Sequence, residues 1–353
     1  TRLTDVTGVQ TCALPILVLS IGQFNQWVSS QVMADGTVMV WPGTPVSEPL
    51  IEGDAVQGIR LMDQGTDKQG RPAPGFMPGM DVRAALTVLG AGPVGPVGQK
   101  IDDHFGMPGG NHHTEWAVGA KMVIGLREGL ELEPGTVIHT FGFPEPEIFG
   151  FLYAHDSGTV SAGVFIPSWF RCPVRNSYRY LQHWMMHPAI WKYLEGGTLR
   201  SWGAKSLEES GLQGEPYLAG NGYARIGEGS GSTNVLAGAG VDEAWITGCQ
   251  LAEAVIELAE AGEAFSRANI EKTYLVKRKA SSLEKELKAA EHSRNGFHAG
   301  FIKGMMGMAL AGLSGGRLSV KAAPAALDEL VPSLEEYYRG VIPPAEIAAT
   351  VQE

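Results

Sequence analysis

The sequence predicts a mixed α/β fold in which glycine-rich loops hold a large ligand and an antiparallel sheet is inserted between the ligand-binding segments. The chain has 47 glycines in 353 residues, well above average usage, and they fall in strand-to-helix turns and in loops of the kind that bind ligands. Residues 116–169 read as four consecutive strands separated by turns. Residues 218–248 place a series of glycines directly before a helical pattern, so a flexible backbone leads into a helix start.

Composition and charge limit the possible functions. The hydrophobic fraction of 44% and the charged fraction of 18% are those of a globular protein long enough for two domains or one large composite domain. The net charge of −11 argues against nucleic acid as the main partner, because phosphate contacts need a basic face. Cys12, Cys172 and Cys249 are too far apart for a disulfide framework or a metal cage, so a reducing compartment is the simplest interpretation.

The N-terminal residues need separate treatment. Residues 6–16 read VTGVQTCALPI, which resembles a translated short-read sequencing adapter. Residues 1–16 are therefore predicted to be a sequencing artefact, and the true protein is expected to begin further upstream. An unusual natural N-terminus is the alternative.

The clearest helix is predicted over residues 241–261, with apolar residues along one stripe and Gly262 as its stop. Asp242 and Glu243 lie in its first turn, where they would repel a diphosphate. This helix start is therefore predicted to face a neutral or weakly anionic ring system. Cys249 lies inside the helix and is predicted to be a small buried thiol rather than a nucleophile.

Residues 81–89 are predicted to form one largely buried strand that ends in GAGPVG. Gly90, Gly92 and Gly95 therefore spell GxGxxG after a strand, which is typical of a dinucleotide fingerprint. Two prolines constrain the turn, the following helix is short, and no second strand ends in an acid about 20 residues further on. These departures argue against a pyrophosphate site here.

Two helical regions are predicted towards the C-terminus. Residues 266–294 carry Lys and Arg, including Arg278, on a helix whose charged face is predicted to be solvated, with Glu284 and Lys288 as an i,i+4 pair. Residues 296–316 are apolar and rich in Met, but too interrupted by glycine for a confident membrane span. They suit either a surface in the interface of a bilayer or packing against the sheet, and the sequence leaves both open.

No set of catalytic side chains stands out. His104, His112 and His113 lack Cys, Asp or Glu at ligand spacing and are predicted to be exposed loop histidines. The sequence contains no GxSxG, HExxH or P-loop motif. A bound cofactor is therefore predicted to do the chemistry, as a flavin does. The aromatic residues of segment 139–155 could line a pocket for an aromatic ligand or form ordinary core.

Three segments together resemble the electron-transfer flavoprotein–ubiquinone oxidoreductase family: LEGGTLRSWGAKSL, GSGSTNVLAGAGVDEAW and HTFGFPEPEIFGFLYAH. The resemblance runs from about Phe24 to Gly316. It implies a glutathione-reductase-2-type FAD-binding fold, a ubiquinone site, electron-transfer flavoprotein as the electron donor and a C-terminal 4Fe-4S cluster. It also implies a peripheral membrane protein at the cytoplasmic face of a bacterial inner membrane or its equivalent.

The resemblance also assigns roles to residues. It places Gly90 and Gly92 in the inner FAD motif, and Gly220 with Asn221 where related flavoproteins hold the ribityl chain. The implied FAD-binding set is Gly90, Gly92, Gly220, Asn221, Asn234, Gly238 and Gly240. The implied quinone contacts are Phe149 and Gly150. The implied membrane patch is Phe301, Met305 and Met306. No catalytic side chain and no metal ligand are implied in this chain.

Two family features are missing from the sequence: the N-terminal βαβ unit with the GxGxxG for the FAD pyrophosphate, and the cysteines of the cluster. The expected organisation is an artefact at 1–16, a partial FAD-binding domain at 17–110, an antiparallel-sheet quinone domain at 111–200, the rest of the FAD-binding domain at 201–265, a helical membrane-facing region at 266–321 and a linker at 322–353. The implied activity is electron transfer from reduced electron-transfer flavoprotein through FAD to a membrane quinone, with this fragment expected to be inactive. The alternatives are an isoprenoid-lipid (geranylgeranyl) reductase of the same superfamily and a non-catalytic fragment.

Overall fold

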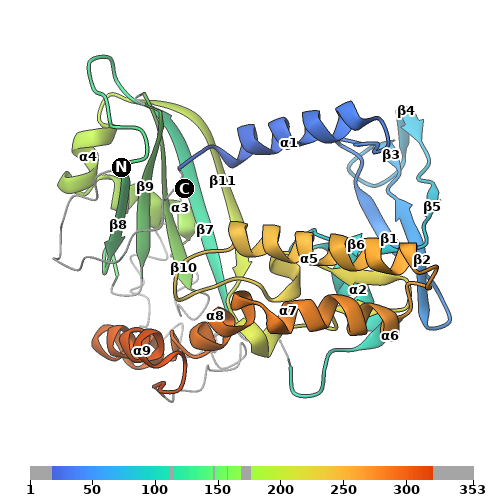
Figure 1. The fold of residues 1–353 in the computed structure, drawn as a ribbon. Helices are drawn as coiled ribbons and strands as arrows, with labels where there is room; N and C mark the ends of the chain where they lie inside the picture. The colour runs from blue at the N-terminus through green and yellow to red at the C-terminus, as the bar shows by residue number, and fades with distance from the viewer. Residues whose placement is uncertain (1–17, 112–114, 146–147, 157, 168–175, 321–353) are drawn as a thin grey trace, which may run out of the picture. The chain divides into compact units, whose positions relative to one another are not determined.

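The computed structural model describes residues 18–111, 115–145, 148–156, 158–167 and 176–320 (Figure 1). Contacts divide the chain into two units. Of the described residues, the sheet unit contains those within 18–41 and 117–206, and the glycine-loop unit contains those within 42–116 and 207–320. The expected artefact at 1–16 and the expected linker at 322–353 lie outside the described residues.

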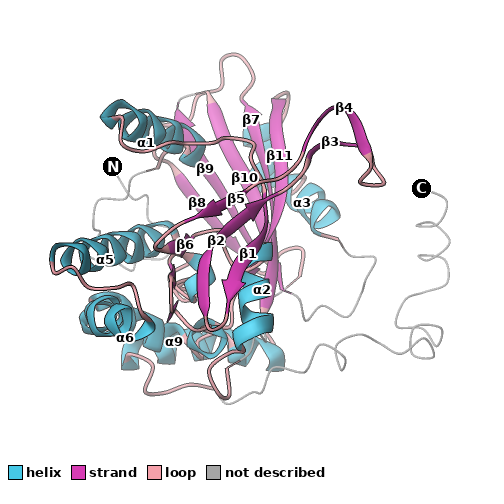
Figure 2. Cartoon of the chain, turned by 90° about the vertical axis from the view of Figure 1, so that its right-hand side faces the viewer, coloured by secondary structure: helices cyan, strands magenta, loops and turns pink. Residues whose placement is uncertain are grey.

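The sheet unit is built on a five-stranded sheet with the order β11-β7-β10-β9-β8. Its central strands are paired antiparallel, and they lie side by side in Figure 2. The strands are β7 (Trp116–Gly125), β8 (Val137–Phe141), β9 (Phe149–Asp156), β10 (Thr159–Pro167) and β11 (Thr198–Glu208). The helices of this unit are α1 (Ile21–Asp35), α3 (Ser177–Met185) and α4 (Pro188–Leu194).

The two faces of this sheet differ because side chains alternate along each strand. Leu152, Ala154, Ala162 and Val164 point to one face, where they form a core with buried residues of α3 and α4. Trp184 of α3 is 1% exposed in this core. The intervening residues of β9 and β10 point to the opposite face.

The helices of the sheet unit follow local sequence signals. Ser20 caps α1, its hydroxyl accepting a hydrogen bond from the Gln23 amide, and Gly36 ends the helix in a left-handed conformation with φ of +79°. Residues 177–194 form two consecutive helices, α3 and α4, and Pro188 starts the second helix at its first position.

The glycine-loop unit contains three small sheets. One has the order β1-β2-β5, one has the order β12-β13-β6, and β3 pairs with β4. Their strands are β1 (Val46–Glu52), β2 (Ala55–Leu61), β3 (Gln64–Thr66), β4 (Pro72–Met77), β5 (Asp81–Arg83), β6 (Thr87–Leu89), β12 (Ala219–Gly220) and β13 (Tyr223–Arg225). β6 runs parallel to β13, with Val88 opposite Ala224.

Helices surround these small sheets. They are α2 (Pro96–Phe105), α5 (Val241–Glu260), α6 (Arg267–Ile270), a π-helical turn (Glu271–Leu275), α7 (Val276–Ala280), α8 (Ser282–Ala290) and α9 (Phe301–Ser314). Short 3₁₀ turns lie at Gly211–Gly214, Glu228–Ser230 and Asn295–Ala299. Leu251 and Leu258 of α5 pack with Ile270 and Tyr274 in a core beside β12 and β13. The long helix predicted over 241–261 is therefore confirmed.

The predicted single strand over 81–89 is wrong. The segment divides into β5, which pairs with β2, and β6, which pairs with β13. The sequence pattern could not show this division, because strands distant in the sequence provide the hydrogen-bond partners of each half.

Three burial predictions are also wrong. The buried stripe of α5 includes Glu243 and Thr247, whereas Trp245 is 55% exposed. Cys249 is exposed rather than buried. Arg278 is not on a solvated face but is 1% exposed. In each case tertiary packing buries or exposes a different helix face from the one that the spacing of apolar and charged residues predicts. The predicted pair of Glu284 and Lys288 is present at 3.2 Å.

Candidate functional site

The face of the five-stranded sheet that points away from α3 and α4 carries a group of aromatic rings, which we call the aromatic face. Its members are Phe141 on β8, Phe149, Phe151 and Tyr153 on β9, and Phe165 on β10. The ring centroids of Phe141 and Phe149 are 5.0 Å apart and edge-on, and those of Phe151 and Tyr153 are 4.8 Å apart and stacked. The rings therefore form a continuous apolar surface.

A glycine makes room for this surface. A Cβ atom at Gly163 of β10 would lie 2.3 Å from Cζ of Phe151, so the Phe151 ring lies directly over the glycine. Phe151 also approaches Phe165, with 5.6 Å between ring centroids. A side chain at position 163 would displace the centre of the aromatic face.

Two imidazole–hydroxyl pairs lie beside these rings, and we call them the polar row. A hydrogen bond of 2.8 Å joins His139 Nε2 and Tyr153 Oη, and one of 2.6 Å joins His155 Nε2 and Ser161 Oγ. Tyr153 and Ser161 are directly opposite in the β9–β10 register, so the two pairs are neighbours. The row thus crosses three adjacent strands.

The polar row is uncharged near neutral pH. Burial lowers the pKa of His139, and burial together with the nearby Lys121 charge lowers the pKa of His155. Burial raises the pKa of Tyr153, so its hydroxyl keeps its proton. Neutral imidazole and phenol groups can both donate and accept hydrogen bonds, which suits a neutral ligand with carbonyl oxygens.

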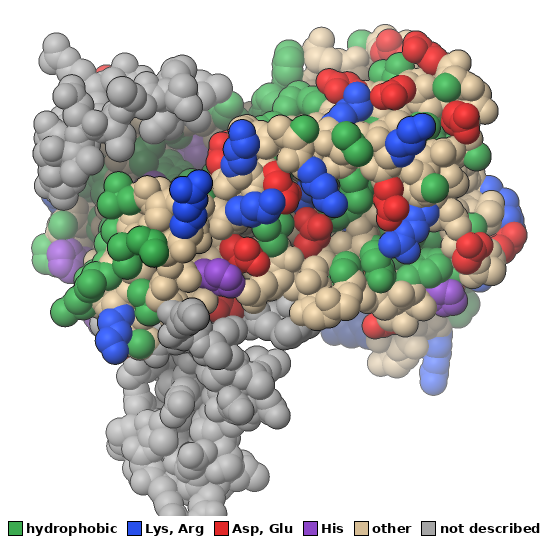
Figure 3. Space-filling model, turned by 60° about the horizontal axis from the view of Figure 1, so that its bottom comes forward, with side chains coloured by type: hydrophobic (Ala, Val, Ile, Leu, Met, Phe, Trp, Pro, Cys, Tyr) green, Lys and Arg blue, Asp and Glu red, His purple; other side chains and the backbone are tan. Residues whose placement is uncertain are grey.

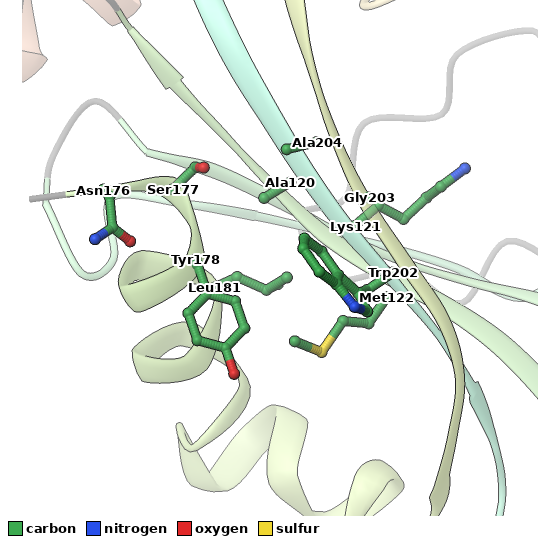
Figure 4. Close-up of a pocket in the computed structure, with 10 residues that line it drawn as sticks. All are labelled: Ala120, Lys121, Met122, Asn176, Ser177, Tyr178, Leu181, Trp202, Gly203 and Ala204. Carbon is green, nitrogen blue, oxygen red and sulfur yellow. The ribbon is translucent and has the colours of Figure 1, made fainter. Parts of the chain in front are cut away.

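A groove lies on the other, helix-covered side of the sheet (Figure 4). Its volume is about 220 Å³, and residues of α3, β7 and β11 line it, among them Met122, Tyr178, Leu181 and Trp202. Trp202 is 68% exposed and Tyr178 is 48% exposed. The groove is separate from the polar row, because Met122 and Leu181 belong to the helix-side core.

In the glycine-loop unit, two loops meet at the carboxyl ends of the parallel strands β6 and β13. A Cβ atom at Gly229 would lie 2.9 Å from the carbonyl oxygen of Gly92, so the two backbones are close together. A Cβ atom at Gly92 would lie 3.6 Å from Oε2 of Glu228. Ligands of α/β proteins bind at the carboxyl ends of parallel strands, so this is the candidate cofactor site.

The start of α5 closes this site. The Gly227 amide donates to Thr247 Oγ1 of α5 at 2.9 Å, which ties the loop after β13 to the helix. Gly240 occupies the position before the helix, and a Cβ at Gly238 or Gly240 would have no neighbour within 4 Å. Open space thus lies beside the backbone at a helix N-terminus, where free amide groups attract electron-rich atoms.

Arg278 holds the loop after β13 in place through its buried guanidinium group. Its guanidinium donates to Ser230 Oγ at 2.9 Å and to the Ser230 carbonyl at 2.6 Å, and lies 3.4 Å from Glu215. Burial raises the pKa of Glu215, and the Arg278 charge opposes this shift. The sequence interpretation missed this buried cation because its neighbours on the helix, Lys277 and Lys279, are lysines with half-exposed or exposed side chains.

Comparisons with known proteins identify the family of this chain. Residues 116–207, which contain nearly all of the five-stranded sheet, match the family model described as ETF-QO, ubiquinone-binding. The mitochondrial electron transfer flavoprotein-ubiquinone oxidoreductase of Arabidopsis thaliana is 33% identical over 294 residues, covering 82% of this chain and 45% of that protein. The chain belongs to the electron transfer flavoprotein-ubiquinone oxidoreductase family.

Other relatives agree with this assignment. The Pseudomonas aeruginosa enzyme of that name is 30% identical over 250 residues, covering 69% of this chain and 45% of that protein. The chain spans about half the length of the curated relatives it matches.

Among solved structures, a geranylgeranyl bacteriochlorophyll reductase-like protein from Thermoplasma acidophilum has a TM-score of 0.61 at 14% identity, covering 93% of this chain and 74% of that chain. The flavin-dependent halogenase CmlS has a TM-score of 0.56 at 12% identity, covering 94% of this chain and 54% of that chain. The mixed α/β fold is thus similar to those of FAD-dependent oxidoreductases.

The quinone contacts that the family resemblance implies lie on opposite faces of β9. Phe149 belongs to the aromatic face. A Cβ atom at Gly150 would lie 2.3 Å from Nε1 of Trp184 and 2.6 Å from Thr140 Oγ1, so Gly150 makes room for a buried tryptophan. Their contact with a quinone stays a prediction.

The cofactor residues implied by the resemblance lie in different loops of the glycine-loop unit, and only some of these loops are close to one another. Gly90 and Gly92 lie in the loop after β6, and Gly238 and Gly240 precede α5. The Asn234 side chain accepts hydrogen bonds from the amides of Leu236 and Ala237, which shapes the loop before α5. The roles of these residues towards FAD stay predictions.

Gly220 and Asn221 lie in and after β12, at the turn that leads to β13. The Asn221 side chain donates to Asp54 at 2.7 Å and accepts from the Arg267 amide at 2.8 Å, so it joins three segments of this unit. Gly227 and Glu228 instead follow the strand that is parallel to β6. The sequence interpretation missed this pair, although the strand-like YARI directly before it was the available signal.

The predicted membrane patch lies on α9. Gly304, Gly307 and Ala311 are buried on the inner face of the helix. The outer face exposes large apolar side chains, and Figure 3 shows hydrophobic side chains gathered over this helix at the left. They are Ile302 (74%), Met305 (39%), Met306 (57%), Leu310 (37%) and Leu313 (90%). Phe301 is only partly exposed. Within the described part of the chain, no helix has both the length and the apolar character needed to span a bilayer.

No metal-binding group is evident in the described part of the chain, where no three His, Cys, Asp or Glu side chains are placed to hold a metal ion. His104 lies in the last turn of α2, so the prediction of a loop histidine is wrong for this residue. His112 and His113 lie outside the described residues.

Proposed function

We propose that the full protein passes electrons from reduced electron-transfer flavoprotein through FAD to a membrane quinone, and that the aromatic face holds the quinone ring. The observation that carries this proposal is the combination of stacked aromatic rings and neutral imidazole–hydroxyl pairs within residues 116–207.

The chemistry of this face favours a quinone. A quinone ring is flat, poor in electrons and carries two carbonyl oxygens. Aromatic side chains present electron-rich faces on which such a ring can stack, and the polar row supplies hydrogen-bond donors for its carbonyl groups. Lys121 of β7 lies opposite Gly163 on this face, so its positive charge would favour a reduced ring with partial negative charge.

We also propose that the loops after β6 and β13 and the start of α5 hold the FAD. The fit rests on two observations: the Gly92 and Gly229 backbones are too close for a side chain at 229, and the space beside Gly238 and Gly240 is open. In this proposal Glu228, whose Oε1 accepts a hydrogen bond from the Glu208 amide at 3.1 Å, faces the cofactor beside Gly92. A bound flavin would accept electron pairs and release them singly or together.

The outer face of α9 supports a peripheral membrane position. Apolar side chains on a helix that packs through small residues on its other face suit the interface of a bilayer. A surface of this kind would bring the protein to the membrane in which the quinone is dissolved.

Quinone binding to the purified chain tests the proposal. A decyl-chain ubiquinone analogue should quench tryptophan fluorescence saturably, because Trp184 lies under β9. Phe149→Ala should weaken this binding about five-fold or more, since it removes a stacking ring. Trp191→Ala, an exposed aromatic residue of α4, is the matched control. Binding that is absent, or equally affected by both variants, would refute the assignment.

The isoprenoid-lipid reductase alternative is supported only by fold. The similarity to the Thermoplasma acidophilum protein is at 14% identity, whereas the curated relatives of about 30% identity are quinone oxidoreductases by name.

A further inference from the structure

The polar row provides hydrogen-bonding groups that quinone binding through stacking alone does not need. Reduction of a quinone to a quinol adds two electrons and two protons, and the protons must reach oxygen atoms on an apolar ring. His139 is on edge strand β8, with part of its side chain exposed to solvent and part packed against Tyr153, whereas Tyr153 on β9 lies among the aromatic rings. The pair therefore connects solvent with the interior of the aromatic face.

We propose that the His139–Tyr153 pair donates a hydrogen bond, and then a proton, to one carbonyl oxygen of a quinone bound on the aromatic face. This inference rests on the proposed function, because it assigns residues to the quinone site.

The geometry favours Tyr153 as the donor. Its ring stacks on Phe151 at 4.8 Å, and its hydroxyl is 2.8 Å from His139 Nε2. When Nε2 carries the imidazole proton, it donates to the phenol oxygen and leaves the Tyr153 proton free for a ligand. The edge-on contact of the two rings, with centroids 5.6 Å apart, holds the imidazole in place.

Proton transfer from Tyr153 to the quinone leaves the His139–Tyr153 pair neutral. The Tyr153 O–H bond breaks as an O–H bond forms on the quinone oxygen, and the phenol oxygen takes the Nε2 proton of His139. Nδ1 of His139 takes a proton from solvent at the same time, so the pair returns to its neutral state as the other tautomer. The two electrons come from a reduced flavin, as in the proposed function, and the second proton comes from solvent.

The second pair is less suited to this role. Nδ1 of His155 is buried and has no hydrogen-bond partner among the described residues, so it has no visible path to solvent. Its other nitrogen is held by Ser161. The row therefore has one open end, at His139.

Binding measurements with two ligands test the inference. One ligand is the decyl-chain ubiquinone analogue, and the other is the matching decylbenzene, which has a ring and chain but no carbonyl group. Tyr153→Phe keeps the stacked ring and removes only the hydroxyl. It should raise the Kd for the quinone about 3- to 10-fold, the range of one lost hydrogen bond, and leave the Kd for decylbenzene unchanged.

Matched variants make the outcomes distinct. Tyr178→Phe removes an exposed hydroxyl from α3 and should change neither Kd, whereas His139→Leu should reproduce the loss seen with Tyr153→Phe. If the chain binds the quinone but Tyr153→Phe binds it as tightly as the parent chain, the inference is wrong and the quinone site stands. If both ligands weaken equally, the hydroxyl acts only through packing and the inference is wrong. If the parent chain binds no quinone, the proposed function fails together with the inference.

Discussion

Glu243 gives the sharpest prediction about stability. It lies in the first turn of α5 but is only 2% exposed, and Oε2 has no hydrogen-bond partner among the described residues. Burial is the main cause that raises the pKa of Glu243 to about 8, and a hydrogen bond to Asp242 and the charge of Glu286 act in the same direction. The same contact lowers the pKa of Asp242. Glu243 is therefore a protonated carboxyl group in the folded chain at neutral pH.

The sign of the pH effect follows from this shift. The folded chain holds the Glu243 proton up to about pH 8, whereas the unfolded chain releases it near the usual glutamate pKa of 4.5. The folded state therefore binds more protons between these values, and the free energy of unfolding falls as the pH rises from about 4.5 to about 8. A shift of this size corresponds to an upper limit of roughly 5 kcal/mol. The amide groups at the helix start favour the charged form and are already included in the shift.

Urea unfolding at several pH values between 5 and 9 measures this effect. The parent chain should lose stability on the order of 2–5 kcal/mol over this range, whereas Glu243→Gln should lose clearly less, because glutamine keeps the shape without titrating. Glu260→Gln, an exposed acid on the same helix, should behave like the parent chain. Parallel pH curves for the parent chain and Glu243→Gln would refute the reasoning.

Three further predictions follow from packing. Gly150→Ala should reduce the free energy of unfolding by about 1–3 kcal/mol in urea, because its Cβ would lie 2.3 Å from Nε1 of the buried Trp184; an unchanged midpoint would contradict this. Arg278→Ala should cost about 3 kcal/mol or more in the same measurement, because it removes a buried cation from its partners; a loss below 1 kcal/mol would show that the contact is unimportant. Replacing both Ile302 and Leu313 by Ser should reduce co-sedimentation of the chain with liposomes without changing its unfolding midpoint, and undiminished binding would remove α9 from the membrane surface.

The sequence predicted those parts of the fold whose signals are local. The helix α5 follows from its apolar spacing and from Gly262, which ends it. The succession of strands in 116–169 follows from alternation and turns. These signals need no knowledge of distant partners, so a single sequence is sufficient for them.

The sites were harder to predict, because their residues come together through pairing of distant strands. Val88 lies opposite Ala224, more than a hundred residues away, and only this pairing places Gly227 and Glu228 beside Gly92. The polar row instead forms between strands that are consecutive in the sequence, and it depends on their register, which places His139 opposite Phe151 and diagonal to Tyr153. Aromatic residues in strands are compatible with a ligand pocket but more often belong to the core, and only the register shows which face they occupy.

The register also explains why two glycines on adjacent strands have different consequences. Gly150 faces α3, where a side chain would collide with Trp184, so its requirement comes from the core of the sheet unit. Gly163 faces the other way, and its requirement comes from the Phe151 ring, because a Cβ there would lie 2.3 Å from Cζ. The glycine at position 150 is needed for the packing of Trp184 in this core. A glycine under the aromatic face sets the height of the surface on which a quinone would stack, so substitution there should alter binding as well as folding. The sheet thus separates its helix-covered core face from its aromatic face by the alternation of side chains along β9 and β10.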